Sequence, residues 1–229
     1  MQRIRVWDLP TRLFHWALVL IVFLAWFTGD VLESSMELHQ WLGIAMVGLI
    51  GFRLTWGLVG SRYARFSQFV AKPAQVKAYL KGDWKGVGHN PLGGWSVVVM
   101  LLLLTAMVLT GLFANNDADF TAPLAFMVTS DVSSFLTRVH HLVFKLLFVV
   151  IGLHILAVFA YKWILGKDLI QPMIDGHKEA ESETDESATG GRWMALILAL
   201  SVAALAMWGA SAAWYTPPAK PAAQTTPDW

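Results

Sequence analysis

The sequence contains no cysteine among its 229 residues, and only 14% of its residues are charged. The missing thiols exclude disulfides, cysteine-bound iron–sulfur clusters and covalently attached c-type haem, because all of these require cysteine sulfur. A soluble domain normally has about 25% charged residues, so the low charge excludes an ordinary water-soluble chain. The redox compartment stays undetermined, because disulfide use cannot report on it here.

Long apolar runs take the place of the missing charge. Hydrophobic residues make up 56% of the chain, and five runs each approach the ~20 residues that a helix needs to cross the hydrocarbon core of a membrane. Many of the 12 tryptophans lie near the run ends, as in the aromatic belt of a membrane interface. The sequence therefore predicts an all-α integral membrane protein. The five runs cover residues 13–28, 39–59, 92–114, 135–165 and 193–215.

The charges between the runs alternate in sign. The loops 29–38 and 115–134 carry acidic residues and no Lys or Arg (Asp30, Glu33 and Glu37; Asp117, Asp119 and Asp131). Basic residues gather at the N-terminus, before the third run and after the fourth (Arg3, Arg5, Arg12; Arg62, Arg65, Lys72, Lys77, Lys81, Lys85; Lys167, Lys178, Arg192). Because cytoplasmic loops are enriched in Lys and Arg, the charges predict the orientation of a multi-pass membrane protein. Its N-terminus is predicted to be cytoplasmic and its C-terminal tail to lie outside.

The polar segments divide the chain into four parts. Residues 1–168 hold the first four runs and are predicted to form the membrane domain. Residues 169–191 are acidic and poor in large apolar side chains, which is typical of a flexible linker and places this segment in the cytoplasm. Residues 192–215 are predicted to form a fifth membrane helix, and residues 216–229 a Pro/Ala-rich outer tail. The first run lacks the small-residue cleavage site of a signal peptide, so we expect it to stay as a helix.

Several histidines lie inside the apolar runs, where an ionisable side chain is unfavourable unless it is paired or binds a metal. His140 and His154 stand 14 residues apart, so on one helix they lie within about 40° of each other and roughly 21 Å apart along the axis. His141 lies about 140° from His154 and is expected to pack or to hydrogen-bond elsewhere.

The predicted depths of the histidines give two pairs. His39 opens the second run on the same side of the membrane as His140, and His15 lies near the cytoplasmic side, toward which His154 is also placed. Each pair can bind one iron through two axial imidazoles, which suits electron transfer, whereas a zinc site usually needs a third protein ligand. The alternative is that each histidine hydrogen-bonds a neighbouring helix.

Glycines and basic side chains accompany the histidines. Gly43 and Gly152 leave space for a flat macrocycle, or they serve ordinary helix packing. Arg53, near the cytoplasmic end of the second run, is expected to pair with a haem propionate or to extend to the interface. Arg138 and Lys145 have the same two alternatives near the other side of the membrane.

Four separated motifs resemble those of bacterial cytochrome b561 and of the b-type cytochrome subunit of nickel–iron hydrogenases. They are VWDLPTRLFHW (6–16), RLTWGLVGSRYARFSQFV (53–70), GHNPLGGW (88–95) and RVHHLVFKLLFVVIGLH (138–154), in that family's order. In the third motif, His89 is expected to serve a quinone or a propionate, or to cap the helix before Pro91. The resemblance implies a four-helix transmembrane dihaem bundle, here with an appended fifth helix. It also implies that the haem ligands are His15, His39, His140 and His154.

The resemblance implies a membrane-bound electron carrier with two haem b, and a quinone as a further candidate cofactor. Its expected partners are quinone or quinol, a periplasmic c-type cytochrome or a hydrogenase-like enzyme, and the lipid membrane. The resemblance also implies the bacterial inner membrane, so that the outer side, where the C-terminus is predicted to lie, is the periplasm. A homodimer and a quinone oxidoreductase activity of this subunit are left open, and no nucleic-acid partner is expected. The alternatives are a haem-free membrane anchor and a transporter that uses the histidines as a proton or ion relay. No Asp or Glu interrupts the five runs, which disfavours the relay.

Overall fold

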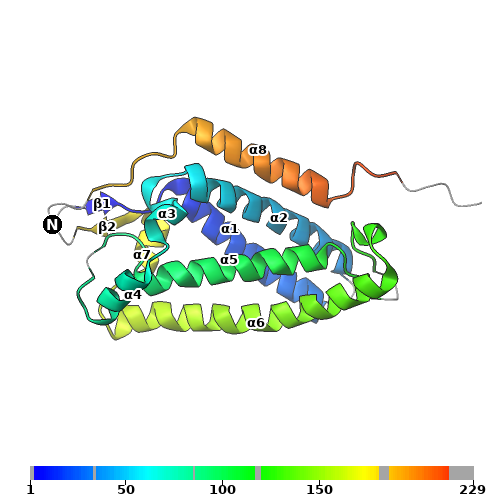
Figure 1. Ribbon diagram of the computed structural model, residues 1–229, viewed down its shortest axis with the longest axis horizontal. Helices are drawn as coiled ribbons and strands as arrows, with labels where there is room; N and C mark the ends of the chain where they lie inside the picture. Colours follow the sequence, from blue (N-terminus) through cyan, green and yellow to red (C-terminus); the bar gives the residue numbers. More distant parts are fainter. Residues whose placement is uncertain (1–2, 33–34, 85, 117–119, 181–185, 217–229) are drawn as a thin grey trace, which may run out of the picture.

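Five helices of the computed structural model are long and apolar enough to cross a membrane (Figure 1), counted within the described residues 3–32, 35–84, 86–116, 120–180 and 186–216. The predicted all-α membrane fold with five spans is confirmed. The membrane helices are α1 (Leu9–Trp26), extended by the π-helical turn η1 (Phe27–Val31), then α2 (Met36–Val59), α5 (Pro91–Gly111), α6 (Ser130–Trp163) and α8 (Trp193–Ala210).

Short polar side chains fix where two of these helices begin. The Asp8 carboxylate accepts a hydrogen bond from the Thr11 N–H (2.7 Å) before α1, and the Asn90 side chain accepts one from the Gly93 N–H (2.7 Å) before α5. Each cap satisfies an N–H that the helix itself leaves free. A proline then occupies the first turn of both helices, where no N–H is needed. The alternative that His89 caps the third span is therefore wrong, because Asn90 holds that position.

An apolar layer joins the first four membrane helices in the middle of the bundle. Side chains of α1 pack against it, Leu18 and Val22 among them. Interiors of this kind are close-packed, so the layer separates the two ends of the bundle, and each end holds histidines. The buried residues of the layer come from α2, α5 and α6 (Met46, Ile50, Leu104, Val108 and Leu147).

The fifth membrane helix, α8, packs chiefly along α2 (Figure 1). A Cβ added to Gly51 would lie 3.4 Å from the Ala206 Cβ, and one added to Gly48 would lie 2.5 Å from the Met207 Sδ. Close approach through small residues is a common way for membrane helices to associate. The helix thus covers one side of α2 and stands beside the other four, as an appended helix does.

Short elements gather at one end of the bundle (Figure 1). There β1 (Arg3–Arg5) and β2 (His177–Glu179) pair antiparallel, beside α3 (Phe66–Phe69), α4 (Pro73–Leu80) and α7 (Ile170–Asp175), with a 3-10 turn at Arg62–Ala64 between α2 and α3. A salt bridge of 2.7 Å joins Arg3 to Asp175. The N-terminus, the loop before α5 and the segment after α6 thus lie at the same end, as an even number of membrane crossings requires. Which end faces the cytoplasm stays a prediction.

Part of the predicted linker 169–191 is folded against this end, since α7 and β2 lie within it. Ala188 is 2% exposed, and its N–H donates to the Arg5 carbonyl. The flexibility of this segment and the division into four parts stay predictions. Predictions that concern Glu33, Lys85, Asp117, Asp119, residues 181–185 and the tail from 217 to 229 lie outside the described residues.

Candidate functional site

His39 and His140 face each other at the end of the bundle away from the two-stranded sheet. His39 lies in the first turn of α2. His140 lies on α6, where its ring is close to Gly111, the last residue of α5. Their ring centres are 6.3 Å apart, and the rings are nearly perpendicular at 81°. Two imidazoles that bind one metal through bonds of about 2 Å have ring centres roughly 6 Å apart. The structure thus brings this predicted pair together, and the role of the two rings as ligands stays a prediction.

Backbone carbonyls of neighbouring helices hold both rings through Nδ1. His39 Nδ1 lies 2.8 Å from the Ala25 carbonyl oxygen of α1, and His140 Nδ1 lies 2.9 Å from the Met107 carbonyl oxygen of α5. A ring nitrogen that faces a carbonyl carries the proton, so Nε2 of the neutral ring is free to bind a metal. Metal-bound histidines almost always donate their other ring N–H to such a partner. Both rings therefore have the tautomer and the support that ligation through Nε2 requires.

Two glycines allow these rings to lie against their neighbouring helices. A Cβ added to Gly29 would lie 2.7 Å from the His39 ring, and one added to Gly111 would lie 2.8 Å from the His140 ring. Gly29 belongs to the π-helical turn η1, and such turns are frequent at functional sites. Sequence reasoning missed both glycines, because glycine at the end of an apolar run ordinarily indicates only where a helix stops.

The two glycines that the sequence singled out border open space. A Cβ added to Gly43 or to Gly152 would meet no atom within 4 Å outside its own stretch of helix. Gly43 stands one turn after His39, and Gly152 stands two residues before His154. Gly43 lies within about 40° of His39 around α2, so the free space there is beside that histidine. Gly152 lies about 160° around α6 from His154, so its open space is on the other side of the helix from that ring.

His15 and His154 lie toward the end that carries the two-stranded sheet. Their side chains interact electrostatically, which places them near each other. The His15 ring meets Trp16 edge-on, with ring centres 5.1 Å apart. His15 Nδ1 is shielded from solvent and has no hydrogen-bond partner among the described residues. Because a buried polar atom normally has a partner, this imidazole calls for a group from outside the chain.

His89 lies close to this second pair. Its ring stands between Trp7 and Phe69, with ring-centre distances of 4.5 Å and 4.7 Å. Burial, followed by the nearby charges of Arg53 and His154, lowers the pKa of His89 to about 3, so the ring is neutral at pH 7. Within the described part of the chain, its buried Nδ1 has no hydrogen-bond partner.

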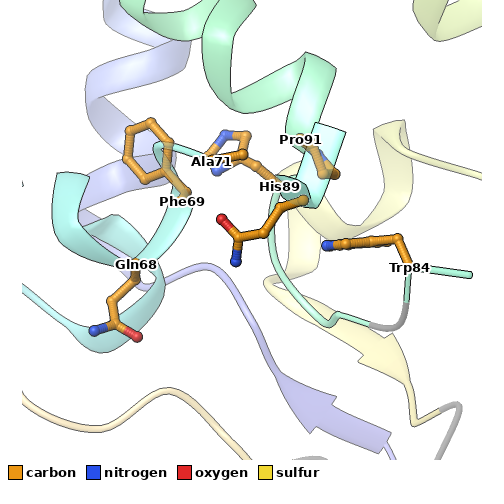
Figure 2. A pocket seen from close by; sticks show the side chains of 7 residues that line it. Gln68, Phe69, Ala71, Trp84, His89 and Pro91 are labelled. Carbon is orange, nitrogen blue, oxygen red and sulfur yellow. The ribbon is translucent and has the colours of Figure 1, made fainter. Parts of the chain in front are cut away.

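A small cavity of about 40 Å³ lies beside His89. Figure 2 shows Gln68 and Trp84 on opposite sides of it. This volume holds a few water molecules and is too small for a quinone ring. The predicted service of His89 to a quinone or a propionate stays a prediction. The cavity is lined by Gln68, Phe69, Ala71, Gln75, Trp84, His89 and Pro91.

Arg53 is 3% exposed and lies at the same end as His89. Its Nη1 donates to the Ala64 carbonyl oxygen at 3.1 Å, and its guanidinium carbon lies 5.0 Å from the centre of the Phe66 ring. Asp8 is close enough to interact with its charge. The guanidinium is enclosed by the chain and not exposed on the surface of the bundle, and its predicted extension to the interface stays a prediction. Its predicted pairing with a propionate is untested and stays a prediction.

Arg138 and Lys145 point away from both histidine pairs. Relative to His140, they lie about 160° and 140° around α6, and both are exposed. The prediction that they bind a propionate beside His140 is therefore wrong. His141 is also exposed, and its ring centre lies 6.2 Å from that of His140, so the predicted packing between helices is not seen.

The donor set suits a macrocycle better than a bare metal ion. Across the described residues, no three His, Asp or Glu side chains come close enough together to hold a metal ion, whereas zinc sites usually have three or four protein ligands. Haem iron receives four ligands from its own ring and needs only the axial ones from the protein. The anchored rings, the close glycines and the open space beside Gly43 fit such a group at His39 and His140. At the other pair, the buried Nδ1 of His15 has no such carbonyl partner among the described residues, so the support seen at His39 and His140 is not repeated there.

The chain is similar to several known proteins. The family model described as prokaryotic cytochrome b561 matches residues 6–176. The chain is similar to the "Probable Ni/Fe-hydrogenase 1 B-type cytochrome subunit" of Escherichia coli (strain K12), at 22% identity over 46% of this chain and 57% of that protein. It is also similar to the "Probable Ni/Fe-hydrogenase B-type cytochrome subunit" of Rhodobacter capsulatus, at 24% identity over 79% of this chain and 83% of that protein. The chain thus spans little more than half the length of the first of these relatives, and no solved structure matches it significantly.

Proposed function

The chain belongs to the prokaryotic cytochrome b561 family, and on that premise we propose that it is a dihaem cytochrome that passes electrons between a quinone and a redox partner. One haem is assigned to His39 and His140, the outer site, and the other to His15 and His154, the inner site. Haem b supplies one-electron transfer when it is bound. The outer pair carries the proposal, because both Nδ1 atoms are fixed by backbone carbonyls in the way that supports a metal-bound imidazole.

The other residues of the chain give each site its surroundings. The apolar layer that includes Leu104 and Leu147 lies between the two sites and keeps polar groups away from the centre of the bundle. His140 and His154 are 14 residues apart on α6, roughly 21 Å along the axis, so the two sites together reach across most of the membrane. At the inner site, Arg53 is proposed to pair with a propionate, because its buried guanidinium interacts with Asp8 but forms no salt bridge among the described residues.

The proposed orientation places the outer site toward the periplasm, because the loops at that end are acidic and those at the other end are basic. The names of the relatives support a hydrogenase-like partner, and a c-type cytochrome is the alternative. Among the described residues, Asp30, Glu37 and Asp131 lie at the outer end. Their negative charge favours a partner with a basic surface and speeds its approach.

The haem content of the purified full chain tests the proposal. A pyridine haemochrome assay is expected to give two haem b per polypeptide. His39→Ala and His140→Ala are each expected to remove the same haem, and His15→Ala and His154→Ala the other one. His177→Ala is the matched control, because this histidine is exposed in β2, and both haems are expected to stay.

A folded and inserted chain that binds no haem would refute the proposal and would favour a membrane anchor. If such a haem-free chain moved protons or ions across vesicles, and the histidine variants did not, the relay would be favoured. Reduction of the bound haem by a quinol in a membrane preparation tests the electron donor separately.

A further inference from the structure

Two basic residues on the lipid-facing side of α6 form no ion pair with any described acidic residue. Arg138 and Lys145 are both exposed, and no carboxylate of the described residues forms an ion pair with either. They are seven residues apart, so they lie within about 20° around the helix and roughly 10 Å apart along it. A charged side chain on a membrane helix is costly and commonly marks a functional position.

Contacts with α5 fix the depth of these two residues. The last residue of α5 lies against the His140 ring, and Asn90, just before α5, donates to the Tyr161 hydroxyl at 2.9 Å. Residues 140–161 of α6 therefore run beside the 21-residue α5, whose length matches the membrane core. Arg138 lies just outside this stretch and Lys145 about 7 Å inside it. Because long helical side chains lean toward the N-terminus of their helix, both charges reach the same headgroup layer.

Exposed apolar side chains lie deeper than this pair on the same side of α6. The loops 29–38 and 115–134 at this end carry acidic residues and no Lys or Arg. Deeper on the same side of α6, Leu142, Leu146 and Val149 are 57%, 50% and 59% exposed. A pair of positive charges above an apolar strip is complementary to one phospholipid, whose phosphate lies above its acyl chains.

We propose that this face of α6 binds an anionic phospholipid, with its phosphate on Arg138 and Lys145 and its acyl chains along the apolar strip. The guanidinium of Arg138 presents a planar pair of N–H donors that fits a phosphate, and Lys145 adds a second charge. His141, between them and also exposed, adds a ring N–H. A second copy of this chain is a poorer occupant, because a two-fold contact would bring the same positive charges together.

Lipid binding to the full chain in nanodiscs, read by native mass spectrometry, tests this site independently of haem. The wild type is expected to retain one phosphatidylglycerol tightly when it is released from mixed phosphatidylcholine–phosphatidylglycerol discs. The double variant Arg138→Gln/Lys145→Gln is expected to bind that lipid roughly 30-fold more weakly, about 5-fold for each basic residue removed near a membrane surface. The exchange variant Arg138→Lys/Lys145→Arg keeps both charges and is expected to retain the lipid.

A second double variant removes the same charge elsewhere. Lys77 and Lys81 are exposed at the opposite end of the bundle, so Lys77→Gln/Lys81→Gln is expected to leave the tightly bound lipid in place. Circular dichroism and elution volume show that each variant is folded. Equal retention by the wild type and by Arg138→Gln/Lys145→Gln would overturn the proposal, as would equal retention of phosphatidylcholine and phosphatidylglycerol. A dimer that this variant loses, without a change in lipid retention, would assign the face to a contact between copies instead.

Discussion

Replacing Gly111 with alanine is expected to empty the outer site and to leave the inner site filled. The new Cβ would lie 2.8 Å from Cε1 and 3.1 Å from Nδ1 of His140. Carbon atoms in contact normally stand about 3.5–4.0 Å apart, so the ring must turn away from α5. Its Nδ1 then loses the Met107 carbonyl oxygen, which lies 2.9 Å away.

The size of this effect follows from two contributions. Inserting a methyl group into a filled position costs about 1–3 kcal/mol, and losing a hydrogen bond costs about 0.5–1.5 kcal/mol. Together they weaken haem binding at the outer site by about 1.5–4.5 kcal/mol. Because each 1.4 kcal/mol is about a factor of ten, the affinity for this haem is expected to fall roughly 10- to 1,500-fold.

The haem content and the reduced-minus-oxidised spectrum of the purified variant measure this loss. Gly111→Ala is expected to retain one haem, with the spectrum that His39→Ala also shows. Gly209→Ala is the matched control, because a Cβ there meets no atom within 4 Å, and it is expected to retain two. If Gly111→Ala bound two haems with an unchanged spectrum, the close approach of α5 would not determine the position of the His140 ring.

Two further predictions concern α6 and α8. His140→Ala is expected to lose the outer haem and His141→Ala to retain both, because only the His140 ring faces His39; the opposite pattern in the haem spectra would show that the helical face is assigned wrongly. Removing residues 192–229 is expected to leave both haems bound, because α8 packs chiefly on α2 and this part of the chain contains no histidine. The haem content per chain of the inserted, truncated protein measures this, and its loss would show that α8 closes the bundle.

The membrane helices and the pairing of the histidines were predictable from the sequence. Run length and apolar composition suffice for the five spans, because the membrane thickness fixes how many residues must be apolar. The helical period alone places His140 and His154 on one face of α6. The same period also puts Arg138 and Lys145 opposite His140. Their outward position was therefore available from the spacing, and it favours the predicted extension to the interface over the predicted pairing with a propionate.

Only the tertiary structure decided how the rings are held. The Nδ1 atoms donate to the carbonyls of Ala25 and Met107, which belong to neighbouring helices. The rings also lie against Gly29 and Gly111. Neither contact can be predicted from one helix alone. The burial of Arg53 under Phe66 depends likewise on how the chain folds back after α2. A sequence determines which residues share a face because the helix repeat is fixed. How closely two helices approach depends on the side chains of both at the point of contact, and that point exists only once the bundle has formed.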